Sequence, residues 1–286
     1  ENTVHITTGP EGLHGARIFF DLVSVGATIN VLLAAVKAKG LTIMENVARE
    51  PEIVDLATFL NNMGAHIRGA GTNEIRIQGV DSLKSMNVHT IIPDRIEAGT
   101  YLSFAAANGN GVLVKNVITE HLDPFLSKLE EMGVRMEIDE DEIYVPGGDV
   151  LSPVNIKTSP FPGFATDLQQ PITPLLMQAR GSSTIIDTLY PERTKHIPEM
   201  QRMGAKISSK DGIITVGHST DLSGTVVEAG EIRAGVSLVG LALMAKGTTV
   251  INKADNILRG YDRIVEKFRG LSVDLEVINE SESLNH

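Results

Sequence analysis

Residues 111–145 read GVLVKNVITEHLDPFLSKLEEMGVRMEIDEDEIYV and contain most of one structural repeat. The β-branched run after Gly111 predicts a strand that ends near Val117, because such residues favour an extended backbone. Apolar residues at helical spacing predict a helix over 122–132, and Gly133 stands where a left-handed residue ends a helix. Two short strands are expected next, at 135–138 and 142–145, joined by an acidic turn.

Upstream residues complete this repeat as a β-α-β-α-β-β unit, with a strand expected at 88–92 and a helix over 96–107. The unit recurs about four times at a spacing of about 70 residues, which predicts an α/β fold built from repeated units. First strands of the other copies are expected at 16–20, 154–158 and 225–227. Each unit exposes an apolar helix face, so we expect the units to surround a shared core of helices rather than form a linear stack.

Glycines recur at two positions of the copies. One set opens an apolar run: Gly40, Gly111, Gly181 and Gly247. The other set closes a helix: Gly64, Gly133 and Gly204. The fourth copy has Ser272 at this second position. These positions are interpreted as structural, which leaves the loops for chemistry.

Composition excludes several function classes. The chain has 286 residues, 42% of them hydrophobic, which is enough for a proper core. Its longest apolar stretches, such as 236–245, are shorter than the roughly 20 residues of a membrane span, so no membrane partner is expected. A net charge of −11 without a run of basic residues argues against a nucleic-acid partner.

Cysteine is absent, which excludes disulfides and thiolate metal sites and fits a cytoplasmic location. The eight histidines lack the spacing of a metal motif, so surface or core roles are expected for them rather than metal ligation. The chain begins at Glu1 without a signal region and is interpreted as a cut end. Residues 4–7 read as the last strand of an earlier unit.

The informative segments are loops before helices, because a helix N-terminus offers free N–H groups and a partial positive charge to anions. Three arginines occupy corresponding loops of the last two units: Arg193, Arg233 and Arg259. Guanidinium groups suit phosphate and carboxylate, although solvated loop charges or helix caps are an alternative interpretation. Asp167 precedes an apolar segment, where it is either an ordinary N-cap or a general base.

At these loops the sequence resembles the enolpyruvyl transferases, in segments that run in order as far as about residue 278. The matching segments are 23–28, 48–55, 93–97, 166–169, 192–193, 231–234 and 259–261. The resemblance implies six units in two lobes, each an inside-out α/β barrel, of which about four units are present. It implies a partial lobe over 1–87, a complete three-unit lobe over 88–278 and a polar tail over 279–286.

The resemblance also implies a reaction: the carboxyvinyl group of phosphoenolpyruvate is transferred to the 3′-hydroxyl of UDP-N-acetylglucosamine, and phosphate is released. This is the first committed step of peptidoglycan synthesis, and hence of cell-wall biogenesis, cell shape and division, and the resemblance implies that it needs no metal or organic cofactor. Asp167 would take the hydroxyl proton and contact the sugar. Phosphoenolpyruvate would be held by Arg193, Glu231, Arg233 and Arg259, the last of these also catalytic. The nucleotide sugar would contact Leu22, Val23, Ser24, Val25, Gly26 and Leu189.

Three positions depart from the family pattern. Leu22 replaces a lysine, which puts one nucleotide phosphate contact in doubt, whereas Glu231 and Tyr190 preserve charge or shape. Two alternative functions stay open: the sister reaction on shikimate 3-phosphate, and a catalytically silent binding or scaffold protein. The resemblance implies that a mobile loop with a reactive cysteine is missing upstream, so we expect the 286 residues alone to be inactive.

Overall fold

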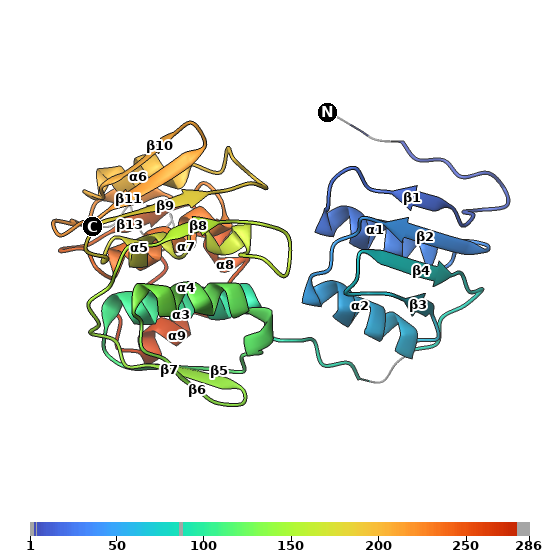
Figure 1. The fold of residues 1–286 in the computed structure, drawn as a ribbon, viewed down its shortest axis with the longest axis horizontal. Coiled ribbons are helices and arrows are strands. Elements are labelled where there is room, and N and C mark those ends of the chain that lie inside the picture. Colours follow the sequence, from blue (N-terminus) through green and yellow to red (C-terminus); the bar gives the residue numbers. More distant parts are fainter. Residues whose placement is uncertain (1–2, 4, 86–87, 279–286) are drawn as a thin grey trace. The chain divides into compact units, whose positions relative to one another are not determined.

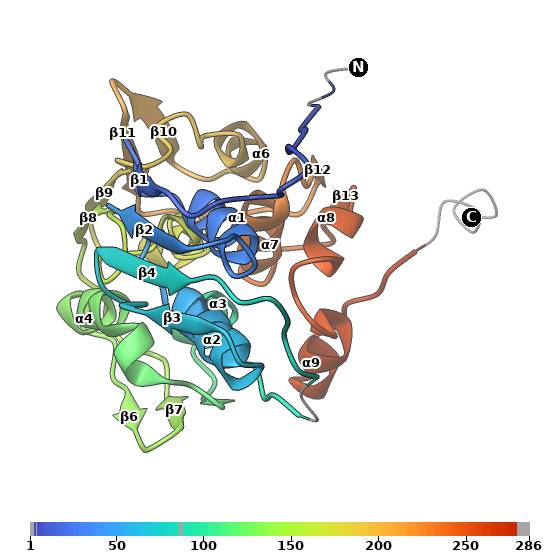
Figure 2. The same cartoon turned by 90° about the vertical axis from the view of Figure 1, so that its right-hand side faces the viewer.

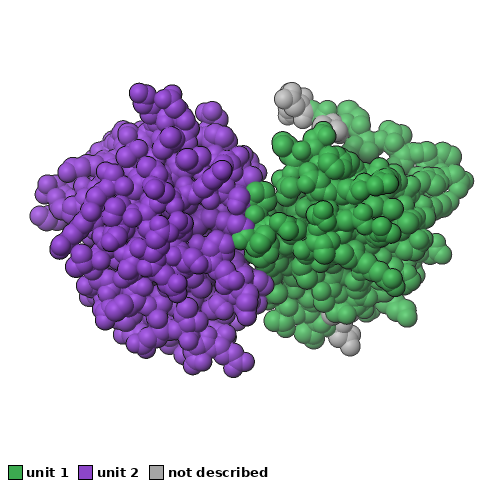
Figure 3. All heavy atoms as spheres, in the orientation of Figure 1, with its two compact units in different colours: residues 1–93, 160–162 green, residues 94–159, 163–286 purple. Residues whose placement is uncertain are grey.

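The computed structural model describes residues 3, 5–85 and 88–278. The chain divides into two compact units (Figure 3). Unit 1 comprises residues 1–93 with 160–162, and unit 2 comprises residues 94–159 with 163–286. The predicted tail, 279–286, lies outside the described residues. Within the described ranges, no helix is long and apolar enough to span a membrane.

Unit 1 holds one complete copy of the β-α-β-α-β-β repeat. Its elements are β1 (Arg17–Phe19), α1 (Val25–Ala35), β2 (Leu41–Glu45), α2 (Pro51–Asn62), β3 (His66–Arg68) and β4 (Glu74–Gln78). The sheet order is β1-β2-β4-β3, with β1 parallel to β2 and the other pairs antiparallel (Figure 2). Alternate residues of β2 and β4 are buried, including Met44, Ile75 and Ile77, and they share one core with helix residues such as Leu32 and Ile53.

Unit 2 holds the rest of the repeats in three separate sheets (Figure 1). The first part contains α3 (Arg95–Asn108), β5 (Val112–Lys115), η1 (Thr119–His121), α4 (Asp123–Met132), β6 (Glu137–Ile138) and β7 (Glu142–Val145). The second contains β8 (Asn155–Lys157), η2 (Thr166–Leu168), α5 (Thr173–Leu176), β9 (Ser182–Ile186), α6 (His196–Arg202), β10 (Ile207–Lys210) and β11 (Ile213–Gly217). The third contains β12 (Val226–Glu228), α7 (Ile232–Ala242), β13 (Val250–Asn252), α8 (Asp255–Leu258) and α9 (Ile264–Gly270). The sheet orders are β5-β7-β6, β8-β9-β11-β10 and β12-β13.

The helices α3, α5 and α7 form the centre of unit 2, with strands at its periphery (Figure 1). Most residues of α3 and α7 are buried, as expected of helices that are surrounded by other elements. A Cβ atom at Gly240 would lie 2.2 Å from the ring of Phe104, and one at Gly99 would lie 2.8 Å from Leu168. Small residues therefore let these elements approach closely. The shared helical core is confirmed in unit 2, whereas the sheets of the described residues do not close into a barrel.

Backbone geometry confirms the structural role of the four positions that end a helix in each copy of the repeat. Gly64, Gly133 and Gly204 have φ angles of 99°, 90° and 91°, and Ser272 has a φ of 63°. Ser272 thus adopts in the fourth copy the left-handed conformation that glycine adopts in the others. The repeat preserves the helix ending even where the residue changes.

Expected strands are missing at three places in the chain. Residues 88–92 form no strand, because they belong to unit 1, where His89 bonds to Asp55 at 3.2 Å instead of pairing beside β5. Residues 5–7 are not in a strand either, and Val4 lies outside the described residues. The last unit lacks its final strand pair over 271–278, where the carbonyl of Leu275 instead accepts a hydrogen bond from Arg269. The domain boundary at residues 87 and 88 stays a prediction.

Candidate active site

Asp167 lies in unit 2 on the short 3₁₀ turn η2, which its neighbour Leu168 anchors in the core. Its Oδ1 accepts a 2.7 Å hydrogen bond from Nη1 of Arg193, and its Oδ2 accepts a 3.2 Å bond from Nη2 of Arg233. The carboxylate is therefore held between two guanidinium groups. The interpretation of Asp167 as an N-cap is wrong, because its side chain bonds to arginines and not to a helix terminus.

The two arginines come from different copies of the repeat. Arg233 lies in the first turn of α7, and Arg193 lies in the loop between β9 and α6. Their side chains are only 14% and 19% exposed, against 37% for Asp167, so they are not solvated loop charges. Each also lies over a tyrosine ring, Arg193 at 5.1 Å from Tyr190 and Arg233 at 5.4 Å from Tyr261. The cluster presents two constrained cations beside one partly exposed carboxylate.

Electrostatics keep Asp167 ionised. Burial opposes its ionisation, but the positive charges and hydrogen bonds of Arg233 and Arg193 outweigh burial and hold its pKa below the ordinary range. For Arg233, burial favours the neutral form, yet Tyr261 and Asp167 raise the pKa of the guanidinium. The resting cluster is an ion-paired network, and an anion that bound the arginines would compete with Asp167 for them.

Glu231 is fixed from the other side of the cluster. Its Oε1 accepts a 2.9 Å hydrogen bond from Nε2 of Gln170 and lies 3.7 Å from Nε of Arg193. The same Gln170 amide lies 3.1 Å from Nδ1 of His196, so Nδ1 acts as the acceptor. Burial and the charge of Arg193 lower the pKa of His196 to about 4, which keeps the ring neutral. Gln170 and the neutral ring of His196, both buried, therefore hold the Glu231 carboxylate in place near Arg193.

Two further predicted site residues, Arg259 and Leu189, make no hydrogen bond or ion pair with the cluster of Asp167 and its arginines in the described residues. Arg259 ends α8 and is exposed, and within the part of the chain that the structure describes its guanidinium group makes no hydrogen bond or ion pair. The backbone N–H of Leu189 donates to Asp187 at 3.0 Å, so this group is already occupied. The structure therefore brings Asp167, Arg193 and Arg233 together, but it leaves Arg259 outside their network.

Unit 1 carries the remaining predicted residues, at the N-terminus of α1. Ser24 caps this helix, its Oγ accepting a 3.2 Å hydrogen bond from the N–H of Ala27. The first-turn N–H groups of Val25 and Gly26 have no acceptor within the helix, as at any helix start. Leu22 is 79% exposed. This segment has the free backbone donors that a phosphate needs, but no cationic side chain at position 22.

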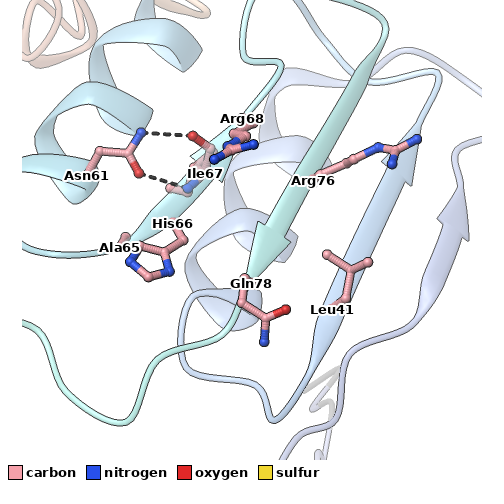
Figure 4. A pocket seen from close by; sticks show the side chains of 8 residues that line it. All are labelled: Leu41, Asn61, Ala65, His66, Ile67, Arg68, Arg76 and Gln78. Atoms are coloured by element: carbon pink, nitrogen blue, oxygen red, sulfur yellow. Dashed lines mark hydrogen bonds between the residues drawn. The ribbon is translucent and has the colours of Figure 1, made fainter.

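A hollow of about 510 Å³ lies elsewhere on unit 1, beside β2, β3 and β4 (Figure 4). It is lined by Leu41, Asn61, Ala65, His66, Ile67, Arg68, Arg76 and Gln78. Arg68 of β3 and Arg76 of β4 lie opposite each other in the register of the two strands. Nε of Arg76 donates a 2.7 Å hydrogen bond to Glu74. The amide of Asn61 is bonded twice to the backbone of Ile67, at 2.8 and 2.9 Å. None of these residues is among the predicted site residues.

Several residues in or next to this network are not among the site residues predicted from the sequence. Asp187, Gln170 and His196 are buried, with exposures of 4%, 0% and 0%. Asp187 directly follows the Ile185-Ile186 pair that ends β9, which is the available signal, because a carboxylate that is buried next to such a strand needs partners. In the described residues, no group of acids and histidines is arranged to hold a metal ion.

Solved structures with the same architecture show that this chain has the enolpyruvyl transferase fold. The enolpyruvyl transferase NikO from Streptomyces tendae superposes with a TM-score of 0.80 at 27% identity, over 87% of this chain and 59% of NikO. The EPSP synthase from Acinetobacter baumannii superposes with a TM-score of 0.69 at 19% identity, over 94% of this chain and 64% of that one, a likeness of fold alone.

Sequence relatives define the family. The family model described as EPSP synthase (3-phosphoshikimate 1-carboxyvinyltransferase) matches residues 1–268, and this chain belongs to that family. A UDP-N-acetylglucosamine 1-carboxyvinyltransferase 2 of Lactiplantibacillus plantarum is 61% identical over 98% of this chain and 66% of its own length. The protein of the same name from Latilactobacillus sakei is 60% identical over 95% of this chain and 65% of its own length. The chain thus spans about two thirds of the length of these relatives.

Proposed function

We propose that the full-length protein containing this chain transfers the carboxyvinyl group of phosphoenolpyruvate to the 3′-hydroxyl of UDP-N-acetylglucosamine. Phosphate is the second product, and the reaction belongs to peptidoglycan synthesis in the cytoplasm. The observation that carries the proposal is the pairing of Asp167 with both Arg193 and Arg233. The names of relatives at 61% and 60% identity support this acceptor over shikimate 3-phosphate.

Phosphoenolpyruvate carries a phosphate and a carboxylate, which suit guanidinium groups in bidentate geometry. In the proposal, Arg233 and Arg193 turn from Asp167 to this substrate, and Arg259 supplies a further cation. Glu231 keeps Arg193 in place. Once the arginines hold the substrate, their positive charges are already in place when negative charge develops during the reaction.

Asp167 supplies the base. The carboxylate is held at a low pKa while it binds both arginines, so it is a weak base in the resting cluster. When the arginines engage the anionic substrate, the pKa of Asp167 rises and the carboxylate can accept the hydroxyl proton. The freed oxygen bonds to C2 of phosphoenolpyruvate while C3 takes up a proton from solvent, which gives a tetrahedral phospholactoyl intermediate. Loss of one proton from C3 and of phosphate from C2 then restores the double bond and forms the carboxyvinyl ether.

The nucleotide end of the acceptor is assigned to unit 1. The backbone donors of Val23, Ser24, Val25 and Gly26 at the start of α1 would bind the UDP moiety, with Leu22 beside them. Leu189 would add a backbone contact through its carbonyl group, because its N–H is bonded to Asp187. These assignments explain how a chain with a net charge of −11 can bind an anionic nucleotide sugar through local donors.

The test is a comparison of acceptors in the full-length protein. Phosphate release from phosphoenolpyruvate is measured with UDP-N-acetylglucosamine and, separately, with shikimate 3-phosphate at equal concentration. The proposal requires release with the nucleotide sugar and none above background with shikimate 3-phosphate. Release with shikimate 3-phosphate only would establish the sister reaction, and release with neither would favour the silent binding protein.

A further inference from the structure

Asp187 is a buried carboxylate with an unusual set of partners. It follows β9 and is 4% exposed. Its Oδ1 accepts hydrogen bonds from Oγ1 of Thr158 at 2.7 Å and from the N–H groups of Leu189 and Tyr190 at 3.0 and 2.9 Å. Its Oδ2 accepts a 2.5 Å bond from Oγ1 of Thr166. All four donors are neutral, so the role of this carboxylate is to fix geometry.

These four bonds join three segments that carry or adjoin the candidate active site. Thr158 directly follows β8, and Thr166 begins η2 immediately before Asp167. The bonded N–H groups of residues 189 and 190 lie in the loop that leads to Arg193. Asp187 therefore ties the turn that carries the candidate base to the loop that carries one of its two arginines.

The hydroxyl group of Thr166 extends this connection to Arg193. Because its proton is donated to Asp187, the oxygen of Thr166 presents a lone pair, which accepts a 3.3 Å hydrogen bond from Nη1 of Arg193. The same Nη1 atom donates to Asp167 at 2.7 Å. Asp187 thus determines the direction of the Thr166 hydroxyl, and that hydroxyl helps to place the guanidinium group against the candidate base.

We propose that Asp187 is a positioning residue of the active site, which acts through Thr166 and the 188–193 loop to set the contact between Arg193 and Asp167. The inference rests on the proposed function for its kinetic consequences, but its geometric part stands on the hydrogen bonds alone. A carboxylate is required, because an ionised carboxylate only accepts hydrogen bonds. The amide of an asparagine has one acceptor oxygen, and its NH₂ group would face one of the four donors.

The first test uses Asp187→Asn in the full-length protein, with Asp149→Asn as the matched control. Asp149 is also a largely buried carboxylate of unit 2 that accepts bonds from one residue, Arg135, away from the cluster. We expect Asp187→Asn to lower kcat/KM by roughly 10- to 100-fold, since small misplacements of catalytic groups have effects of this size. Asp149→Asn should leave kcat/KM unchanged.

The pH profile separates positioning from a general loss of stability. Loosening Arg193 removes part of what lowers the pKa of Asp167, so the acidic limb of kcat/KM should move to higher pH in Asp187→Asn. A merely destabilised enzyme keeps the position of that limb. The proposal would be overturned if the acidic limb of the pH profile did not move in Asp187→Asn. It would also be overturned if Asp149→Asn, at similar stability, lost as much kcat/KM as Asp187→Asn.

A second variant covers the case in which Asp187→Asn does not fold. Thr166→Val removes only the hydroxyl group that links Asp187 to Arg193, and it should shift the acidic limb in the same direction by a smaller amount. Thr166→Ser, which keeps a hydroxyl group, should recover most of this change. Equal profiles for the valine and serine variants would contradict the proposed link.

A spectroscopic readout is independent of turnover. The guanidinium NMR signals of Arg193 should exchange more rapidly with solvent in Thr166→Val and Asp187→Asn than in the unmodified protein, while those of Arg135 stay unchanged. If the unmodified protein lacks transferase activity, the proposed function fails, yet this measurement still decides the positioning role. Unchanged Arg193 signals in both variants would refute it.

Discussion

Nη1 of Arg233 donates a 3.0 Å hydrogen bond to the hydroxyl oxygen of Tyr261. Tyr261 is 1% exposed, and its hydroxyl group also lies 3.1 Å from Oγ1 of Thr100 on the central helix α3. The guanidinium group that faces Asp167 is therefore connected on its far side to the core of unit 2. This connection leaves Nη2 of Arg233 to face the carboxylate.

Tyr261→Phe tests this connection. The variant keeps the packed ring but removes one hydroxyl group that bonds to a charged partner, and we expect it to lower the free energy of unfolding by about 1–2 kcal/mol. Urea unfolding of unit 2 measures the change, with the half-exposed Tyr144 as the matched Tyr→Phe control. An equal effect of the two substitutions would show that the bond from Arg233 contributes nothing specific.

Arg259→Ala tests the exposed arginine. Its guanidinium group is not engaged within the described structure, so it can bind an anion without first breaking an ion pair. In the full-length protein we expect the KM for phosphoenolpyruvate to rise roughly 10- to 100-fold, the range for a lost hydrogen bond to a charged group. The KM for UDP-N-acetylglucosamine should change little. Arg202→Ala on α6 is the control for loss of one exposed cation, and an Arg259→Ala variant that matches it kinetically would remove Arg259 from the site.

His196 predicts a pH dependence of stability. Burial and the charge of Arg193 lower its pKa from 6.5 to about 4 in the folded protein. Below pH 6.5 the unfolded chain binds a proton that the folded protein does not, so stability falls as the pH decreases from about 6.5 towards 4. The full loss is about 3 kcal/mol for a shift of this size, and most of it should be present at about pH 4.5.

The measurement is the free energy of urea unfolding between about pH 7.5 and 4.5 for the unmodified chain and for His196→Gln. Asp167 does not interfere, because its lowered pKa places the loss of its contribution below the ordinary carboxyl range. The slope should be smaller in His196→Gln. Parallel curves for the two proteins would exclude His196 as the cause.

Unit 1 should be less stable than unit 2. Its core is a single cluster with fewer buried side chains than the main cluster of unit 2, and small cores leave less apolar burial to offset chain entropy. Amide hydrogen exchange followed by mass spectrometry should show faster exchange in β2 and β4 than in β9 and β11. Equal protection of these strands would contradict the expectation.

Repetition made most of the fold predictable. The helices at 95–108 and 123–132 agree with their predicted spans, because periodic apolar residues and helix-ending glycines act locally. The strand expected at 88–92 fails for a non-local reason: His89 finds its partners, Asp55 and the ring of Phe59, in unit 1. Sequence alone does not reveal which sheet an apolar segment joins.

The candidate site was only partly predictable. Asp167, Arg193 and Arg233 could be named from loop position and family resemblance, but their mutual contacts join residues 26 and 66 positions apart. Asp187, Gln170 and His196 carry no motif, and only the folded chain shows which parts of the site they contact. Arg259 fits the sequence pattern as well as Arg233 does, yet the structure separates the two by their partners.

The most direct test of the proposed chemistry is phosphate release by the full-length protein and its Asp167→Asn variant, with phosphoenolpyruvate and UDP-N-acetylglucosamine, together with nucleotide-sugar binding by calorimetry. Asparagine keeps the shape of the side chain but cannot accept the hydroxyl proton as a carboxylate does. We expect turnover to fall by roughly 100-fold or more, the scale of general base catalysis, while the Kd for UDP-N-acetylglucosamine stays nearly unchanged. Turnover equal to that of the unmodified protein would contradict the assignment of Asp167 and, with it, the proposed active site.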